Sequence, residues 1–193
     1  AKHLQEAGEI YDSEGEPDEA LECFERAAEH FESEKSPGHA TQCLARIGSI
    51  RAQRGEYEAA ADCLERAARE CLSSDLLRYS ARDYMFRAFL CMAVKGDHEG
   101  AARNLEKYCS WDSAFAASRE ATFCRRIAAA IKEPSTGLVS DAVGDYEEIG
   151  KLGQWHSKMI AKIRKAVEIS QYVAGVPAPS SSAPPTSSSS PIV

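Results

Sequence analysis

The residues of this 193-residue chain best suited to metal binding or nucleophilic chemistry are seven cysteines and five histidines. His39 and Cys43 stand four positions apart, so one helix face could present both to a metal. A structural zinc site needs four ligands, however, and the sequence contains no Cys-x-x-Cys pair. Cys23 and Cys63 recur at one position of a repeated segment, as small buried apolar residues do. The pattern favours reduced, buried thiols; a metal or redox role is the less favoured alternative.

Motifs of the common enzyme classes are absent from the sequence. It contains no glycine-rich phosphate loop, no Gly-x-Ser-x-Gly and no His-Glu-x-x-His. No pair of catalytic-looking carboxylates stands out, so the 30 acidic residues are interpreted as solvated helix faces. We therefore expect a protein that is not an enzyme, uses no cofactor and no metal, and acts by binding.

Charge and hydropathy narrow the kind of partner. The net charge of −7 argues against nucleic acid, whose binding proteins usually gather a basic excess on one face. No run of about 18 apolar residues and no leader sequence occurs, which predicts a cytosolic protein. The chain starts at Ala1 and in mid-pattern, so we expect a fragment that lacks earlier repeats.

The elements that must position any binding side chains are revealed by an internal repeat. Residues 15–27 (GEPDEALECFERA) recur forty positions later at 55–67 (GEYEAAADCLERA), and weaker copies begin at 96 and 137. The equivalent alanines of the four copies are Ala20, Ala60, Ala101 and Ala142. An apolar pattern with helical spacing precedes the copies, so each unit is predicted to be a helix, a short turn and a second helix.

Small residues at fixed places in the unit define its packing. Gly8 and Gly48 are expected to let the two helices of a unit approach closely, while Phe24 or Leu64 fills the gap between adjacent units. The pattern resembles the tetratricopeptide repeat, although the period of 40 to 41 residues exceeds the usual value of about 34. The sequence thus predicts an all-α, TPR-like solenoid of about four helix hairpins.

The C-terminal part contains one more helix and then a change of composition. Trp155, Met159, Ile163 and Val167 form an apolar stripe at steps of four, which predicts a ninth helix that caps the stack. The last charged residue is Glu168, and the segment beyond it is rich in Pro and Ser. We predict a helical solenoid with its C-terminal cap at 1–168 and a disordered tail at 169–193.

Residues 75–91 (DLLRYSARDYMFRAFLC) resemble a signature of the soluble NSF attachment proteins, alpha class. Agreement continues at 114–120 and 152–165, so the resemblance spans residues 1 to about 168 and implies the C-terminal portion of such a protein. It implies a cytoplasmic adaptor, peripherally associated with vesicle and target membranes. Such an adaptor binds the four-helix bundle of syntaxin-type SNAREs and recruits the hexameric ATPase NSF, which disassembles the bundle.

The resemblance also implies the contact residues. Family members place basic side chains on a concave face against an acidic SNARE surface, a complementarity that gives register and association rate. Lys2, Arg46, Arg82 and Arg87 match such basic positions. Gln42 stands where the family has a further basic contact, which removes one charge.

At the end that faces the ATPase, the resemblance implies acidic groups. Asp97 and Glu133 match them, whereas Ala129 and Lys132 replace other expected acids. The family's acidic tail with a penultimate leucine is replaced by a neutral segment, in which Ile192 is a loose counterpart of that leucine. Binding is therefore better supported than stimulation. The alternative is a TPR-like scaffold that binds a different helical partner without stimulating NSF.

Overall fold

The computed structural model describes residues 1–175, and ten helices lie within them. They are α1 (Lys2–Glu14), α2 (Pro17–Ser33), α3 (Pro37–Gln53), α4 (Tyr57–Leu72), α5 (Arg78–Ala93), α6 (His98–Trp111), α7 (Ser113–Ala116), α8 (Arg119–Lys132), α9 (Thr136–Glu147) and α10 (Gln154–Val173). Helix α10 continues past residue 168, where the helical region was predicted to end. Most of the predicted tail, including Ile192, lies outside the described residues.

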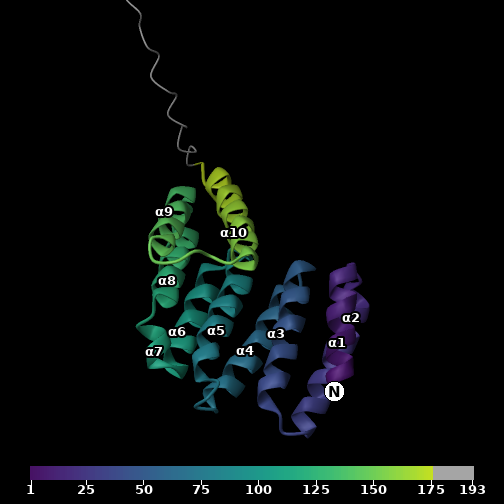
Figure 1. Ribbon diagram of the computed structural model, residues 1–193. Coiled ribbons are helices and arrows are strands. Elements are labelled where there is room, and N and C mark those ends of the chain that lie inside the picture. The colour runs from purple at the N-terminus through teal and green to yellow at the C-terminus, as the bar shows by residue number, and fades with distance from the viewer. Residues whose placement is uncertain (176–193) are drawn as a thin grey trace, which may run out of the picture.

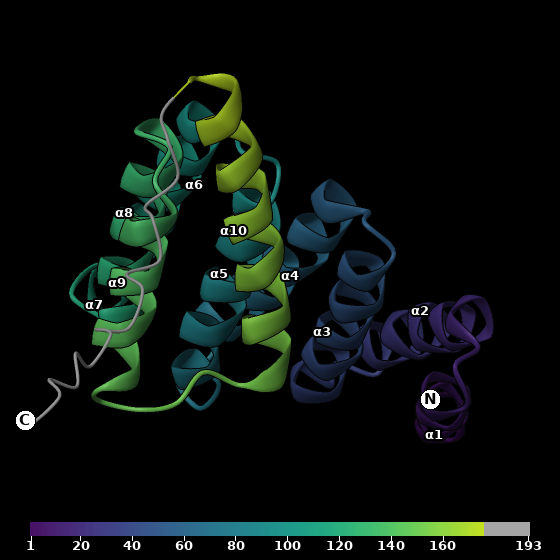
Figure 2. The same cartoon turned by 90° about the horizontal axis from the view of Figure 1, so that it is seen from above.

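Eight of these helices pair into four stacked antiparallel hairpins, α1–α2, α3–α4, α5–α6 and α8–α9 (Figure 1). The view from above shows the hairpins following one another from α1 to α9, with α10 lying beside α5 (Figure 2). The predicted all-α, TPR-like solenoid of about four hairpins with a C-terminal capping helix is confirmed. The short helix α7, between the third and fourth hairpins, was not predicted.

The turns inside the first three hairpins have the same backbone conformation. Gly15, Gly55 and Gly96 have φ values of 80°, 85° and 71°, in the left-handed region that glycine adopts without a steric penalty. Each glycine follows the first helix of its hairpin, where such a residue commonly ends a helix. The short turn predicted between the two helices of a unit thus lies at these glycines.

Close approach of the two helices in a hairpin depends on Gly8 and Gly48. A Cβ atom on Gly8 would lie 3.0 Å from the ring of Phe24, and one on Gly48 would lie 2.8 Å from Cγ of Leu64. Phe24 and Leu64 therefore fill space inside their own hairpins. Both are fully buried and also belong to the core shared with the following unit, so the predicted role between units was incomplete.

We expect Gly48→Ala to lower the free energy of unfolding by about 2 kcal/mol, because the added methyl group overpacks the α3–α4 contact. Gly144→Ala is the matched control, since Gly144 lies in α9 with nothing within 4 Å of the added carbon. The control should gain about 0.5–1 kcal/mol from the better helix propensity of alanine. Urea unfolding followed by far-ultraviolet circular dichroism measures both; equal stability of the two variants would contradict the packing argument.

Ion pairs join successive hairpins at equivalent positions. Arg54, after α3, pairs with Asp18 of α2, and Lys95, after α5, pairs with Glu58 of α4. Asp18 and Glu58 occupy the same place in the two sequence copies. These pairs are largely exposed and contribute little free energy. They nevertheless repeat with the hairpins and favour one stacking register.

Every helix between residues 1 and 175 is too short or too polar to cross a membrane.

Candidate functional site

The first helices of three successive hairpins line one hollow of about 360 Å³, called here the first-helix furrow. Its lining residues are Gln5 and Glu9 of α1, Gln42, Cys43, Ala45, Arg46 and Ser49 of α3, Asp83, Tyr84 and Arg87 of α5, and Phe24 of α2. On α3, for example, Gln42, Arg46 and Ser49 follow steps of four and three residues, so they share one face of the helix. The repeat therefore aligns polar side chains from three hairpins along one surface.

Arg46 is the accessible cation of the furrow. Its side chain is 56% exposed, and its guanidinium lies 3.9 Å from a carboxylate oxygen of Asp12, which is a weak contact. Cys43 lies in the same furrow with its side chain buried. Burial, assisted by the charge of Glu9, raises the pKa of the Cys43 thiol to about 11. The furrow thus presents a cation to solvent and keeps its thiol protonated.

Arg87 lies in the same furrow but its guanidinium is engaged inside the protein. The side chain is only 14% exposed, lies 3.9 Å from Asp83 and donates a hydrogen bond to Ser49. The ring of Trp155 lies 4.6 Å from the guanidinium carbon. Burial lowers the pKa of Arg87 below its ordinary value, although Asp83 opposes the effect. Arg87 thereby links α3, α5 and α10, and its role as a partner contact stays a prediction.

The other two predicted basic contacts lie outside the furrow. Lys2 is exposed in the first turn of α1. Arg82 is half-buried on α5, where its guanidinium lies 5.8 Å from the ring centre of Tyr79 and lines a separate hollow of about 260 Å³. The structure therefore brings Arg46 and Arg87 together, and leaves Lys2 and Arg82 at other places on the first helices.

The acidic residues matched to the ATPase-facing end lie in turns inside hairpins. Asp97 is exposed in the α5–α6 turn, where its Oδ1 accepts a hydrogen bond of 3.0 Å from the backbone N–H of Gly100. Glu133 is exposed in the α8–α9 turn and ends α8. Turns inside antiparallel stacked hairpins lie at one edge of the solenoid, so both carboxylates belong to the same edge (Figure 1).

Sequence reasoning missed the residues that hold α10 against α5. His156 stacks on Phe86 with ring centres 5.1 Å apart, and its Nε2 lies 3.4 Å from Oδ1 of Asp83. Burial raises the pKa of Asp83, but His156 and Arg87 outweigh burial and leave this pKa below its ordinary value. The apolar stripe through Trp155 was the available signal; it indicated a buried face but not the partner helix.

The family model for soluble NSF attachment proteins matches residues 1–168. The chain belongs to the soluble NSF attachment protein family. Mouse alpha-soluble NSF attachment protein is 32% identical over 169 residues, which are 87% of this chain and 57% of the mouse protein. Bovine beta-soluble NSF attachment protein is 31% identical over 87% of this chain and 56% of its own length. The vesicular-fusion protein SEC17 of Komagataella phaffii is 31% identical over 62% of this chain.

This member of the soluble NSF attachment protein family spans a little over half the length of its mammalian relatives. The matched residues 1–168 cover all four hairpins and most of α10. The furrow, the edge with Asp97 and Glu133, and the α5–α10 contact all lie inside the family match. Ile192 lies beyond both the match and the described residues.

The buried thiols of this family member have surroundings that disfavour reactivity. Burial raises the pKa of the Cys91 thiol to about 12, and the thiolate is the form that attacks or binds metal. His39 stacks on Phe31 with ring centres 4.8 Å apart. In residues 1–175, no group of three His, Cys, Asp or Glu side chains is placed to hold a metal ion.

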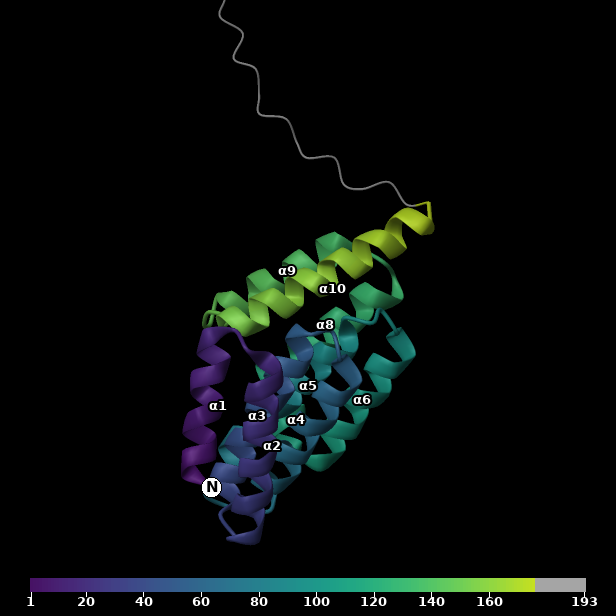
Figure 3. The ribbon, with the colours of Figure 1, turned by 90° about the vertical axis from the view of Figure 1, so that its right-hand side faces the viewer.

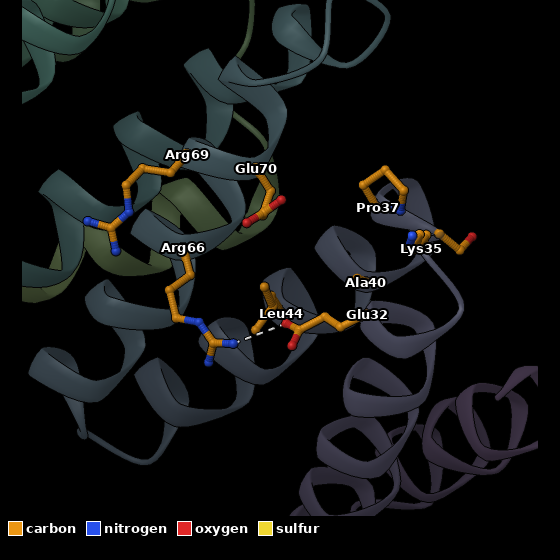
Figure 4. Close-up of a pocket in the computed structure, with 9 residues that line it drawn as sticks. Glu32, Lys35, Pro37, Ala40, Leu44, Arg66, Arg69 and Glu70 are labelled. Carbon is orange, nitrogen blue, oxygen red and sulfur yellow. Dashed lines mark hydrogen bonds and ion pairs between the residues drawn. The ribbon is translucent and has the colours of Figure 1, made fainter.

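A further hollow of about 510 Å³ lies where α2, α3 and α4 meet (Figure 4). Its charged residues have both signs, and Arg66 is held 3.1 Å from Glu32 across it. Arg69 turns away from Glu32 in Figure 4, and its guanidinium lies 5.3 Å from the ring centre of Trp111. None of the predicted contact residues lines this hollow, so the first-helix furrow is the better candidate site.

Proposed function

We propose that this protein is an adaptor that binds the SNARE four-helix bundle and recruits the NSF ATPase for SNARE disassembly in vesicle fusion. It acts in the cytoplasm, peripherally associated with vesicle and target membranes, and performs no catalysis itself. Family membership supports this proposal, since the relatives are named as NSF attachment and vesicular-fusion proteins. The partners and the compartment are the part of the proposal that experiment must establish.

The observation that carries the proposal is the first-helix furrow. Side chains from α1, α3 and α5 line it, so the surface runs across three hairpins and suits a rod-like partner better than a small molecule. Arg46 supplies an exposed cation at its centre, with Lys2 and Arg82 as further basic contacts on the same helices. Asp97 and Glu133, which lie in the turns inside the third and fourth hairpins, are the proposed contacts to the ATPase.

The test reverses one charge in the furrow and one elsewhere. Arg46→Glu should weaken capture of a preformed SNARE bundle about five- to tenfold, because an attractive contact becomes repulsive. Arg26→Glu on α2 is the matched control: its side chain is 59% exposed and its guanidinium lies 3.8 Å from Glu22. The Arg46 side chain is 56% exposed, and its guanidinium lies 3.9 Å from Asp12. The control should bind like the parent chain in a pull-down titration.

Equal binding by both variants would remove Arg46 from the contact surface. Raising the salt concentration should narrow the difference in binding between the two variants, because added salt shortens the distance over which exposed charges interact. The NSF ATPase rate with a preformed SNARE complex is the second readout. No increase at a saturating concentration of this chain would favour the scaffold that binds a helical partner without stimulating NSF.

A further inference from the structure

The outer face of α10 carries a regular stripe of cations followed by apolar residues. We call Lys158, Lys162, Lys165, Ile169 and Tyr172 the α10 stripe; they succeed one another at steps of four, three, four and three residues. These steps are the spacing at which one helix faces another along a shared seam. Ile169 is 56% exposed and Tyr172 is 87% exposed, so the seam has no covering partner within residues 1–175.

The charge of α10 differs from that of the rest of the chain. The helix contains four Lys and Arg residues but one acid, Glu168, in a protein whose net charge is −7. In the hairpins, most arginines pair with carboxylates, as Arg51 does with Glu25 at 2.7 Å. Lys158 and Lys165 form no ion pair with any described residue. The stripe therefore presents uncompensated positive charge.

Packing of the opposite side holds the stripe in a fixed place. Met159, Ile163 and Val167 are buried, so α10 cannot turn its stripe inward without exposing them. Lys162 donates a hydrogen bond of 3.4 Å to the backbone oxygen of Ala52, at the end of α3. Figure 3 shows α10 running alongside α9, and α10 also packs against α5. Helix α10 thus begins near the furrow, where Trp155 meets Arg87, and the stripe follows along the helix from Lys158 onward.

We propose that the α10 stripe is a second docking line, which binds an acidic helix of the same rod-like partner that occupies the furrow. This inference rests on the proposed function. The helical spacing favours a helix as the occupant, and the unpaired Lys158 and Lys165 favour acidic side chains. Ile169 and Tyr172 provide apolar contact at the far end. A membrane surface suits the stripe less well, because amphipathic membrane helices bury a broad apolar face, whereas α10 buries its apolar face inside the protein.

Two adjacent cations on α10 provide the test. Lys165→Glu changes the stripe, whereas Arg164→Glu makes the same charge change on an exposed residue that points about 100° away around the helix. With a preformed SNARE four-helix bundle as the probe, Lys165→Glu should weaken capture about five- to tenfold, and Arg164→Glu less than about twofold. Far-ultraviolet circular dichroism of both variants checks that α10 remains folded.

Three results would overturn the inference. Equal losses in the two variants would mean that net charge, and not the stripe, governs binding. If Lys165→Glu captures the SNARE bundle as well as the parent chain does, the stripe is not a docking line. If this variant instead binds phosphatidylserine-containing vesicles more weakly than the parent chain does, the face binds membranes. If the parent chain itself captures no SNARE bundle, the proposed function fails and the inference fails with it; the parental measurement separates that case from the first two.

Discussion

Phe86→Ala is expected to lower the free energy of unfolding by about 3–5 kcal/mol, the range for removing a buried ring from a packed core. Phe86 is 2% exposed, and the rings of Phe123, Tyr146 and His156 lie 5.5, 5.8 and 5.1 Å from it. These partners belong to α8, α9 and α10. One side chain of α5 therefore joins the fourth hairpin and the capping helix to the third hairpin.

Urea unfolding measures this loss, and the fluorescence of Trp155 in a Trp111→Phe background reports whether α10 leaves α5. Phe86→Leu is the control, since it keeps much of the apolar volume and should cost about 1–2 kcal/mol. A loss below about 1 kcal/mol for Phe86→Ala would show that the aromatic cluster does not hold these helices together.

Glu65→Ala is expected to cost about 3 kcal/mol, at the low end for breaking a buried charge contact. Glu65 of α4 is 8% exposed; its Oε1 accepts hydrogen bonds of 2.6 Å from the hydroxyl of Tyr108 and from Lys107, both on α6. Burial and the charge of Glu65 raise the pKa of Tyr108 well above its ordinary value, so the hydroxyl remains a donor. In the Glu65→Ala variant, the fully buried hydroxyl of Tyr108 has lost its hydrogen-bond acceptor.

A double-mutant cycle tests the assignment. Tyr108→Phe removes the hydroxyl but leaves Glu65 with Lys107, which is 38% exposed, so the single loss should be about 1–2 kcal/mol. The double variant should cost less than the sum of the single losses, because the unpaired hydroxyl no longer exists. Strict additivity in chemical denaturation would contradict a shared hydrogen bond.

The repeat in the sequence was sufficient to predict the hairpins. The spacing of 40 residues between Ala20 and Ala60 defined the length of the unit, and the apolar pattern before each copy indicated its first helix. That these units share one surface could also be predicted from the sequence, because a repeat places equivalent side chains on one face. Arg46 was predicted in a different way, from the resemblance to the family, and its role as a partner contact stays a prediction.

The contacts of α10 could not be predicted in the same way. An apolar stripe such as that through Trp155 and Met159 shows that a helix face is buried, but it does not identify the helix that covers it. Helix α10 packs directly on α5, although the fourth hairpin lies between them in the sequence. This packing depends on specific pairs such as Arg87 with Trp155. For this reason Arg87 resembled a free surface cation in the sequence and is largely buried in the structure.

The contact of α10 with α5 also affects how the protein unfolds. In a simple solenoid each unit interacts only with its neighbours, so either end can unravel one unit at a time. Here α10 contacts both α9 and α5, and the third hairpin, the fourth hairpin and the cap form a closed set of contacts. The last units must therefore open as one cooperative block. The first hairpin has no such closing contact: α2 packs mainly against α3, so α1 and α2 can fray more independently. The free energy of local opening should therefore be lower for the first hairpin than for the block formed by the third hairpin, the fourth hairpin and α10.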